Sequence, residues 1–296
     1  PAFAEGESII DDVTDSTVTN KHVPDVFDIS AKKNWVDLDD KWELRPGTVT
    51  FHLEYKVGNG QWTKLDDDDN RITSGDVEDL LDTDTYPEST VYMVSDDDVT
   101  QEIDWDGEAS WTNLTANVRV GGVTYPVQYR VVEDDVDKNY KSTPSATVTK
   151  SSASKAVEVK NELIKGSIKV SKNFTMNGQT IDKYMLWGLI QDGIIPGTLT
   201  VNLYRGEEWL ESKDLTFVKD QGYGTVEFTG LPLYEADGTT KIKYIVDDEA
   251  DDPLGAWPYI AYENGVSVTI ADASVPKTAV VTNDYAGGNL TVKKIW

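Results

Sequence analysis

An internal repeat restricts the possible folds of this chain more than any other feature of its sequence. Five short phrases occur in the same order in two successive stretches. The first phrase, Ile29-Ser-Ala-Lys-Lys33-Asn-Trp35, returns as Ile168-Lys-Val-Ser-Lys172-Asn-Phe174. The other four pairs begin at Pro46 and Pro196, at Trp111 and Phe228, at Tyr129 and Tyr244, and at Val157 and Ala279. Five phrases in one order indicate two copies of one structural unit.

The repeat also sets the expected domain boundaries. Complete units run over 25–163 and 164–285, and the first carries an acidic insertion near 65–110. Residues 1–24 contain Thr17-Val-Thr-Asn20, which matches the closing strand of a preceding unit. Residues 286–296 carry Leu290-Thr-Val-Lys-Lys294, which matches the opening strand of a following unit. We therefore expect this chain to be a slice of a longer array.

Within each unit the side chains alternate as they do in β-strands. Short runs rich in Val, Thr, Tyr and Trp are interrupted by Gly, Asn and Asp, and only 77–82 suggests a helical turn. Many short strands at this spacing are typical of a β-sandwich. The predicted fold class is all-β, with tandem sandwiches. Because the linkers between units are short, we expect them to form a semi-rigid rod.

Composition excludes several classes of function. The formal charge is −26, so neither nucleic acid nor an anionic membrane surface is an expected partner, since binding to both relies on clustered Lys and Arg. The chain has no cysteine and two histidines, which argues against disulfides, thiolate chemistry, metal sites and bound cofactors. No apolar run approaches the roughly 18 residues of a membrane helix, so no membrane insertion is expected in this segment.

The alternation of the strands places three unusual polar residues of each unit on the core side. Residues two apart in a strand share a face. The inward polar residues are then Lys33, Asn161 and Glu133 in the first unit, and Lys172, Asn283 and Asp248 in the second. An unpaired buried charge is costly, so each trio is expected to satisfy itself or to be neutral. A bulge that shifts the register would instead turn Lys32 and Lys169 inward.

Such a trio has the components of an acyl-transfer reaction. Burial favours the uncharged form of an amine, which is then nucleophilic, and the uncharged form of a carboxylic acid. The amine would attack the side-chain amide of Asn while the acid polarises the carbonyl group and relays protons. Ammonia would leave, and an amide bond would join the two side chains. This is a single self-cross-linking event, so we do not expect a turnover enzyme.

The same residues carry a resemblance to a known family. The opening Lys-x-Trp strand, the middle Trp-Thr-x-Leu phrase, the Tyr-x-Val-x-Glu strand and the Asn-bearing last strand resemble the CnaB-type (Cna protein B-type, Ig-like) domains of Gram-positive surface adhesins and pilins. The resemblance implies Ig-like sandwiches, with a spontaneous Lys–Asn isopeptide bond that joins the first and last strands of each unit. It implies cross-links Lys33–Asn161 and Lys172–Asn283, assisted by Glu133 and Asp248.

The second unit departs from this pattern, because Asp248 stands where Glu is usual and its shorter side chain has less reach. Glu249 is adjacent but has the wrong parity. The two terminal fragments are also different from the complete units. Asn20 lacks the Lys of its own unit and Lys294 lacks its Asn, so neither is expected to be cross-linked within this chain.

Other patterns have alternative interpretations. Aspartate clusters at 66–69, 96–98, 104–106 and 247–252 offer oxygen ligands for calcium, although none matches a calcium loop and a solvated acidic face is the commoner use. Tryptophans outside the repeated phrases could stack on sugars or pack beneath loops, and these are Trp42, Trp105, Trp187 and Trp257. Val275-Pro-Lys277 faintly resembles the lysine motif of polymerised pilins, and a turn before the last strand explains it equally well.

The sequence therefore predicts a structural stalk segment of a bacterial cell-surface adhesin or pilus-like protein. Its expected location is extracellular, at the cell surface or cell wall, and its expected partners are neighbouring repeats of the same chain and an unidentified host or cell-surface ligand. A carbohydrate-binding or accessory module of a large extracellular protein is the alternative.

Overall fold

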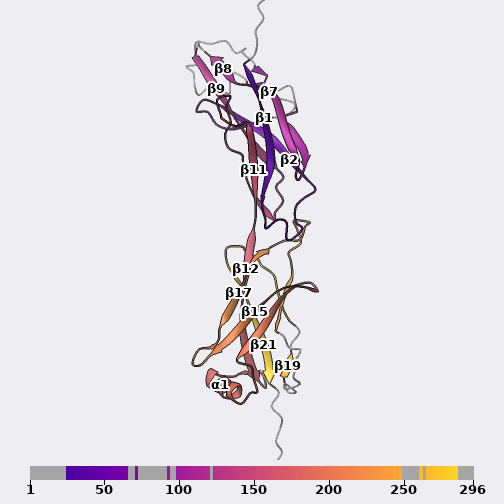
Figure 1. Ribbon diagram of the computed structural model, residues 1–296, viewed down its shortest axis with the longest axis vertical. Helices are drawn as coiled ribbons and strands as arrows, with labels where there is room; N and C mark the ends of the chain where they lie inside the picture. The colour runs from indigo at the N-terminus through magenta and orange to yellow at the C-terminus, as the bar shows by residue number, and fades with distance from the viewer. Residues whose placement is uncertain are drawn as a thin grey trace, which may run out of the picture.

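The structure, a computed structural model, describes residues 25–65, 71–72, 92–93, 98–120, 123–248, 260–262 and 265–285. Two β-sandwiches lie end to end along the long axis of the molecule (Figure 1). The predicted all-β fold with tandem sandwiches in a rod is confirmed. The described residues contain a single α-helix, α1. The predicted helical turn at 77–82 and the predicted terminal strands at 1–24 and 286–296 lie outside the described residues.

The first sandwich is built from strands β1 to β11. One sheet has the order β10-β11-β1-β7, and the facing sheet has the order β3-β2-β9-β8 with β6 also paired to β2. The strands of the first sheet are β1 (Val26–Val36), β7 (Glu108–Thr115), β10 (Tyr140–Thr143) and β11 (Ala156–Leu163). Those of the second are β2 (Thr48–Val57), β3 (Thr63–Lys64), β6 (Thr100–Asp104), β8 (Asn117–Val120) and β9 (Val123–Asp134). A separate pair consists of β4 (Arg71–Ile72) and β5 (Tyr92–Met93).

The second sandwich repeats this plan. Its first sheet has the order β13-β12-β21-β19 with β17 also paired to β12, and its second has the order β16-β15-β14-β18-β20. The first contains β12 (Lys165–Met176), β13 (Gln179–Thr180), β17 (Thr225–Pro232), β19 (Ile260–Tyr262) and β21 (Lys277–Tyr285). The second contains β14 (Thr198–Arg205), β15 (Glu208–Val218), β16 (Gly222–Tyr223), β18 (Tyr244–Asp248) and β20 (Val266–Val268). Helix α1 spans Lys183–Gln191 between β13 and β14.

The first sandwich has two short strands where the second has one long strand. In the second sandwich β15 is continuous along β14. In the first, β3 and β6 pair with the two ends of β2, and β4 and β5, which come between them in the sequence, form a separate pair. Residues of β6 and β7 fall inside the range 65–110 expected for the insertion, but they pair with β2 and β1 of the sandwich. The extra segment therefore begins after β3 and ends before β6.

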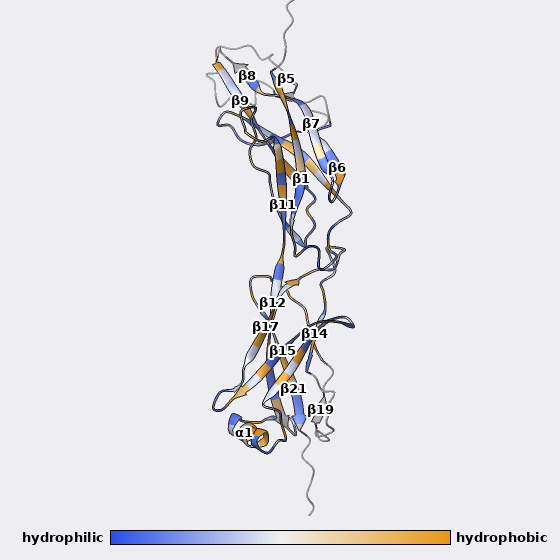
Figure 2. Cartoon of the chain, in the orientation of Figure 1, coloured by the Kyte–Doolittle hydropathy of each residue, from blue (hydrophilic) through white to orange (hydrophobic). Residues whose placement is uncertain are grey.

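Burial follows the strand alternation that the sequence shows. In β9 every second residue from Val127 to Glu133 is buried, and hydrophobic and hydrophilic residues interleave along the strands (Figure 2). The core of the first sandwich contains the fully buried rings of Trp111, Tyr129 and Phe51. The equivalent core of the second contains Tyr244 and Phe228. Both sandwiches thus close over aromatic residues from the repeated phrases.

The two sandwiches share a packed joint. A single residue, Ile164, separates β11 from β12, and its backbone N–H donates to the carbonyl oxygen of Asn139 at 2.7 Å. Four residues that precede β12 in the chain pack into the core cluster of the second sandwich, and they are Trp42, Leu44, Tyr140 and Leu163. The joint is therefore continuous with a hydrophobic core. Among the described residues, no helix is both long and apolar enough to cross a membrane.

Candidate cross-linking sites

The first candidate site lies where the two sheets of the first sandwich face each other. Strand β1 runs parallel to β11, with Lys33 opposite Val159 and Trp35 opposite Asn161. Lys33 and Asn161 therefore lie on neighbouring strands and are offset by two residues along them. Because residues two apart in a strand share a face, both side chains lie on the core side. Glu133 comes from β9 in the facing sheet. The fold brings together the three residues predicted from the sequence.

Glu133 links the other two members of the first site. The Lys33 amine donates to Oε2 of Glu133, and the Asn161 amide nitrogen donates to Oε1 at 3.1 Å. The side chains of Lys33 and Glu133 are 0% and 3% exposed, and Asn161 is buried. Oδ1 of Asn161 has no hydrogen-bond partner in the described part of the chain. The amide thus has a free carbonyl oxygen in a dry pocket, next to an amine and a carboxyl group.

The second site has the same construction on equivalent strands. Phe174 of β12 pairs with Asn283 of parallel β21, so Lys172 and Asn283 repeat the arrangement of the first site. Oδ2 of Asp248 accepts from the Lys172 amine at 2.9 Å and from the Asn283 amide nitrogen at 2.8 Å. The shorter side chain of Asp248 therefore reaches both groups, although through one oxygen where Glu133 uses two.

Burial sets the electrostatics of both amines. It lowers the pKa of Lys33 below its ordinary value, and the hydrogen bond and charge of Glu133 offset this only in part. Burial lowers the pKa of Lys172 in the same way, against the attraction of Asp248. A lower pKa increases the population of the neutral amine, which is the nucleophilic form. Aromatic rings border both amines, with the Lys33 nitrogen 5.4 Å from the ring centroid of Trp35 and the Lys172 nitrogen 4.9 Å from that of Phe174.

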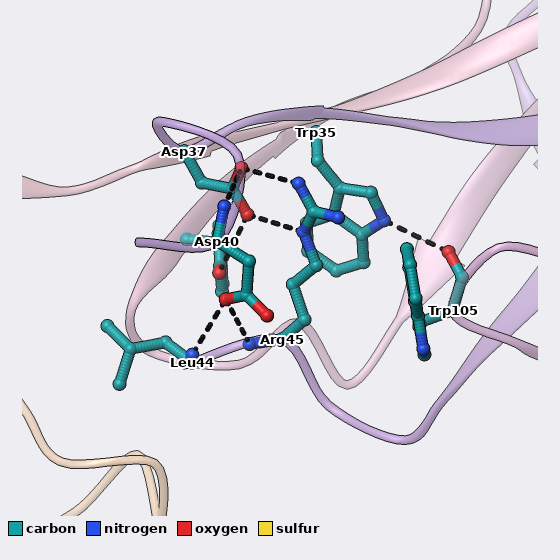
Figure 3. Close-up of polar contacts among 7 residues, drawn as sticks. Trp35, Asp37, Asp40, Leu44, Arg45 and Trp105 are labelled. Atoms are coloured by element: carbon teal, nitrogen blue, oxygen red, sulfur yellow. Dashed lines mark hydrogen bonds and ion pairs between the residues drawn. The ribbon is translucent and has the colours of Figure 1, made fainter. Parts of the chain in front are cut away.

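A polar cluster that the sequence did not reveal holds Trp35 in place (Figure 3). The indole N–H of Trp35 donates to the carbonyl oxygen of Trp105 at 3.0 Å. The guanidinium carbon of Arg45 lies 5.5 Å from the ring centroid of Trp35 and 5.0 Å from that of Trp105. Arg45 also donates two hydrogen bonds of 2.7 Å to Asp37. Arg45 and Asp37 stand outside the repeated phrases, so no pattern in the sequence singled them out.

The Asp37 carboxylate is the buried anchor of this cluster. Burial raises its pKa, but hydrogen bonds from Arg45 and from the backbone of Asp40 outweigh that effect and leave the pKa below its ordinary value. The hydroxyl of Tyr140 donates to the same carboxylate at 3.3 Å. The intervening loop is tightly turned, with positive φ angles of 64° at Leu38 and 56° at Asp40. Asp37 therefore ties the end of β1 to the joint.

The alternative lysines lie on the opposite face of their strands. The Lys32 side chain is 60% exposed and pairs with Glu108 at 3.3 Å, and Lys169 is exposed. The two predicted unpaired residues, Asn20 and Lys294, lie outside the described residues. The same is true of Trp257 and of the aspartates at 66–69, 96–97 and 251–252.

The alternative ligand sites receive little support from the described side chains. Trp42 is 7% exposed in the shared core, and Trp187 stacks on Phe217 with ring centroids 6.1 Å apart. Trp105 is 38% exposed, and Arg45 occupies a position over its ring. Within the described ranges no group of three or more His, Asp or Glu side chains is arranged to hold a metal ion.

Comparison with known proteins gives a family for part of the chain. Residues 187–271, from α1 to the segment after β20, match the Cna protein B-type domain. No curated protein sequence matches the chain. Similar solved structures include two B repeat units of the collagen binding protein of Staphylococcus aureus, with 19% identity and a TM-score of 0.39 over 94% of this chain and 54% of that one. This chain therefore spans about half the length of that structure.

Two pilins show the same distant likeness. The minor pilin of Streptococcus agalactiae has 11% identity and a TM-score of 0.29, covering 90% of this chain and 99% of the pilin. The shaft pilin of Lactobacillus rhamnosus GG has 10% identity and a TM-score of 0.28, covering 90% of this chain and 100% of the pilin. At these TM-scores the likeness bears on neither ligand nor role. The resemblance to Cna protein B-type domains is nevertheless confirmed, because the family match covers most of the second sandwich.

Proposed function

We propose that this chain is a stalk segment of a bacterial cell-surface adhesin or pilus-like protein, and that each sandwich forms one intramolecular Lys–Asn isopeptide bond. The bonds join Lys33 to Asn161 and Lys172 to Asn283. The observation that carries the proposal is the repetition of one arrangement: in both sandwiches a buried lysine and a buried asparagine on adjacent parallel strands contact the same carboxyl group.

The reaction follows from the chemistry of these groups. The neutral amine of Lys33 attacks Cγ of Asn161, and a new C–N bond forms while the carbonyl oxygen takes up the electron pair. Glu133, which contacts both nitrogen atoms, takes a proton from the attacking amine and passes it to the departing amide nitrogen, and the electron pair on the oxygen then re-forms the carbonyl group. The bond from Cγ to Nδ2 then breaks and ammonia leaves. No oxidant, metal or cofactor is needed, and each site reacts once.

The position of each bond suits a stalk. Tension along a tandem array enters a unit through its first strand and leaves through its last, which here are β1 and β11, or β12 and β21. A covalent link between these strands carries the tension past the rest of the sandwich. The chain has no cysteine to serve that purpose. Its charge of −26 would keep crowded copies soluble and apart outside the cell.

Intact-mass measurement tests the proposal. The wild-type chain should be lighter than its sequence by two ammonia molecules, and proteolysis should release one branched peptide for each site. Lys33→Ala should remove one of the two losses, whereas the matched control Lys32→Ala, at the exposed neighbouring position, should keep both. A wild-type mass equal to that of the unmodified sequence would overturn the cross-link proposal.

A further inference from the structure

Trp35 connects the first cross-linking site to the joint between the sandwiches. Its ring packs against the core cluster of the first sandwich and also against that of the second. The Lys33 amine lies 5.4 Å from the ring centroid. The ring of Tyr140 meets that of Trp35 edge to face at 5.0 Å and is itself part of the second cluster. The ring over the reactive amine therefore has part of its packing in the joint.

The loop from Asp37 to Arg45 both holds Trp35 and packs into the second sandwich. Asp37 and Arg45 stand at the two ends of the loop, and Asp37 holds the Arg45 guanidinium over the ring. Between them, Trp42 and Leu44 are buried in the second core cluster. The two functions of the loop are linked by Asp40, whose carboxylate accepts from the backbone N–H of Leu44 at 2.9 Å. The loop therefore connects the docking surface of the second sandwich directly to Arg45 and Trp35.

The second sandwich contributes its own side of the joint through the turn before β18. The Asn139 amide nitrogen donates to the carbonyl oxygen of Glu235 at 3.1 Å. Gly238 lies so near Asp137 that an added Cβ would come 2.7 Å from its Oδ2. A side chain at Gly238 would therefore have to displace the Asp137 carboxylate, which accepts from the backbone N–H of Asn139 at 2.7 Å.

We infer that docking of the second sandwich completes the first cross-linking site, with Trp35 as the positioning residue that holds the Lys33 amine dry and aimed at Asn161. This inference rests on the proposed function. It makes the first bond dependent on the folding of the unit that follows it. The second site differs, because Phe174 packs in a separate cluster with Tyr223 and α1 of its own unit. The second bond is therefore an internal control for the first.

A pair of glycine variants tests the dependence on docking. Gly238→Glu places bulk and a second carboxylate against Asp137. Gly206→Glu is the matched control, because it makes the same charge change at a similar φ, 60° at Gly206 and 62° at Gly238, and nothing lies within 4 Å of the added Cβ. Each chain is made by cell-free synthesis, quenched at intervals and digested, and the two branched peptides are quantified separately. Hydrogen exchange at the Ile164 amide, which bonds to the carbonyl oxygen of Asn139 beside the joint, reports local opening there.

Gly238→Glu should slow the first bond by about tenfold or more, within the range that misplacing reacting groups costs, and should leave the second bond unchanged. Gly206→Glu should change neither. Faster exchange at Ile164 together with a wild-type rate for the first bond would overturn the inference. Absence of the first bond in the wild-type chain would instead refute the proposed function, so the two failures are distinguishable.

Two variants at position 35 test the positioning role directly. Trp35→Ala should slow the first bond, and Trp35→Phe, which copies the Phe174 of the second site, should restore most of the rate. If Trp35→Ala slowed the reaction only by destabilising the protein in general, Trp35→Phe would not be expected to restore the rate of the first bond. Equal rates for the alanine variant and the wild-type chain would overturn the inference even if the glycine variants left the joint closed.

Discussion

Replacing Glu133 by glutamine should separate the acid of the first site from its shape. The variant keeps a side chain of the same length in the buried position but cannot relay protons, so we expect the first bond to be absent and the second to form. The covalent link between Lys33 and Asn161 closes a loop of 161 − 33 = 128 residues. By analogy with a disulfide that closes a loop of this size, its loss should lower the free energy of unfolding of the first sandwich by about 5 kcal/mol.

Urea denaturation followed by tryptophan fluorescence measures this change, with intact mass recorded on the same samples. At a typical slope of about 2 kcal/mol per molar urea, the unfolding midpoint of the first sandwich should fall by about 2.5 M. Asp248→Asn is the matched variant in the other unit, where the loop is 283 − 172 = 111 residues and the expected shift is similar, about 5 kcal/mol, in the second transition. If Glu133→Gln loses the ammonia release yet unfolds at the wild-type midpoint, the reasoning about loop closure is wrong.

Three further substitutions test other parts of the structure. The folded-state pKa of Asp37 is depressed, so its contribution to stability is present above about pH 4 and is lost as the pH falls through the folded-state pKa. Asp37→Asn should therefore flatten the acid side of a Tm profile recorded from about pH 6 to about pH 2. Gly166→Ala puts a Cβ 2.6 Å from the side chain of Ile270 and should destabilise the second sandwich by about 1–3 kcal/mol in calorimetry, whereas Gly188→Ala, with nothing within 4 Å in α1, should be neutral or stabilising. Asp182→Ala removes the N-cap of α1 and should cost about 1 kcal/mol in the same measurement, and an unchanged Tm would show that the cap contributes nothing.

Strand alternation made the candidate sites predictable from sequence. The apolar residues of β1 occupy every second position, so the parity of Lys33 follows once Ile29 and Ala31 are assigned to the core. The repeat then supplied the order of the strands, and the position of Asn161 on a last strand beside the first followed from the family resemblance. Parity and order are local or repeated features, which is why they can be read without coordinates.

Helix α1 was not predicted, because its sequence is dominated by aromatic and aliphatic residues that also suit strands. Its capping signal was present, since Asp182 accepts from the backbone N–H groups of Tyr184 and Met185 at 2.8 and 2.9 Å. The joint was not predictable either, since Trp42 and Leu44 occur in one unit and have no repeated counterpart. Contacts between units depend on how two folded surfaces meet, which no periodicity within a strand encodes.

The direct passage from β11 into β12 leaves the array with almost no slack. Between Asn161 and Lys172 the chain advances 172 − 161 = 11 residues, nearly all of them in β-strand. At about 3.3 Å per residue this stretch is already about 36 Å long, and a fully extended chain would gain only a few ångström more. If the two isopeptide bonds are in place, a pull on one end reaches the other without first uncoiling a linker. The segment would then transmit a sudden force with little extension of its own.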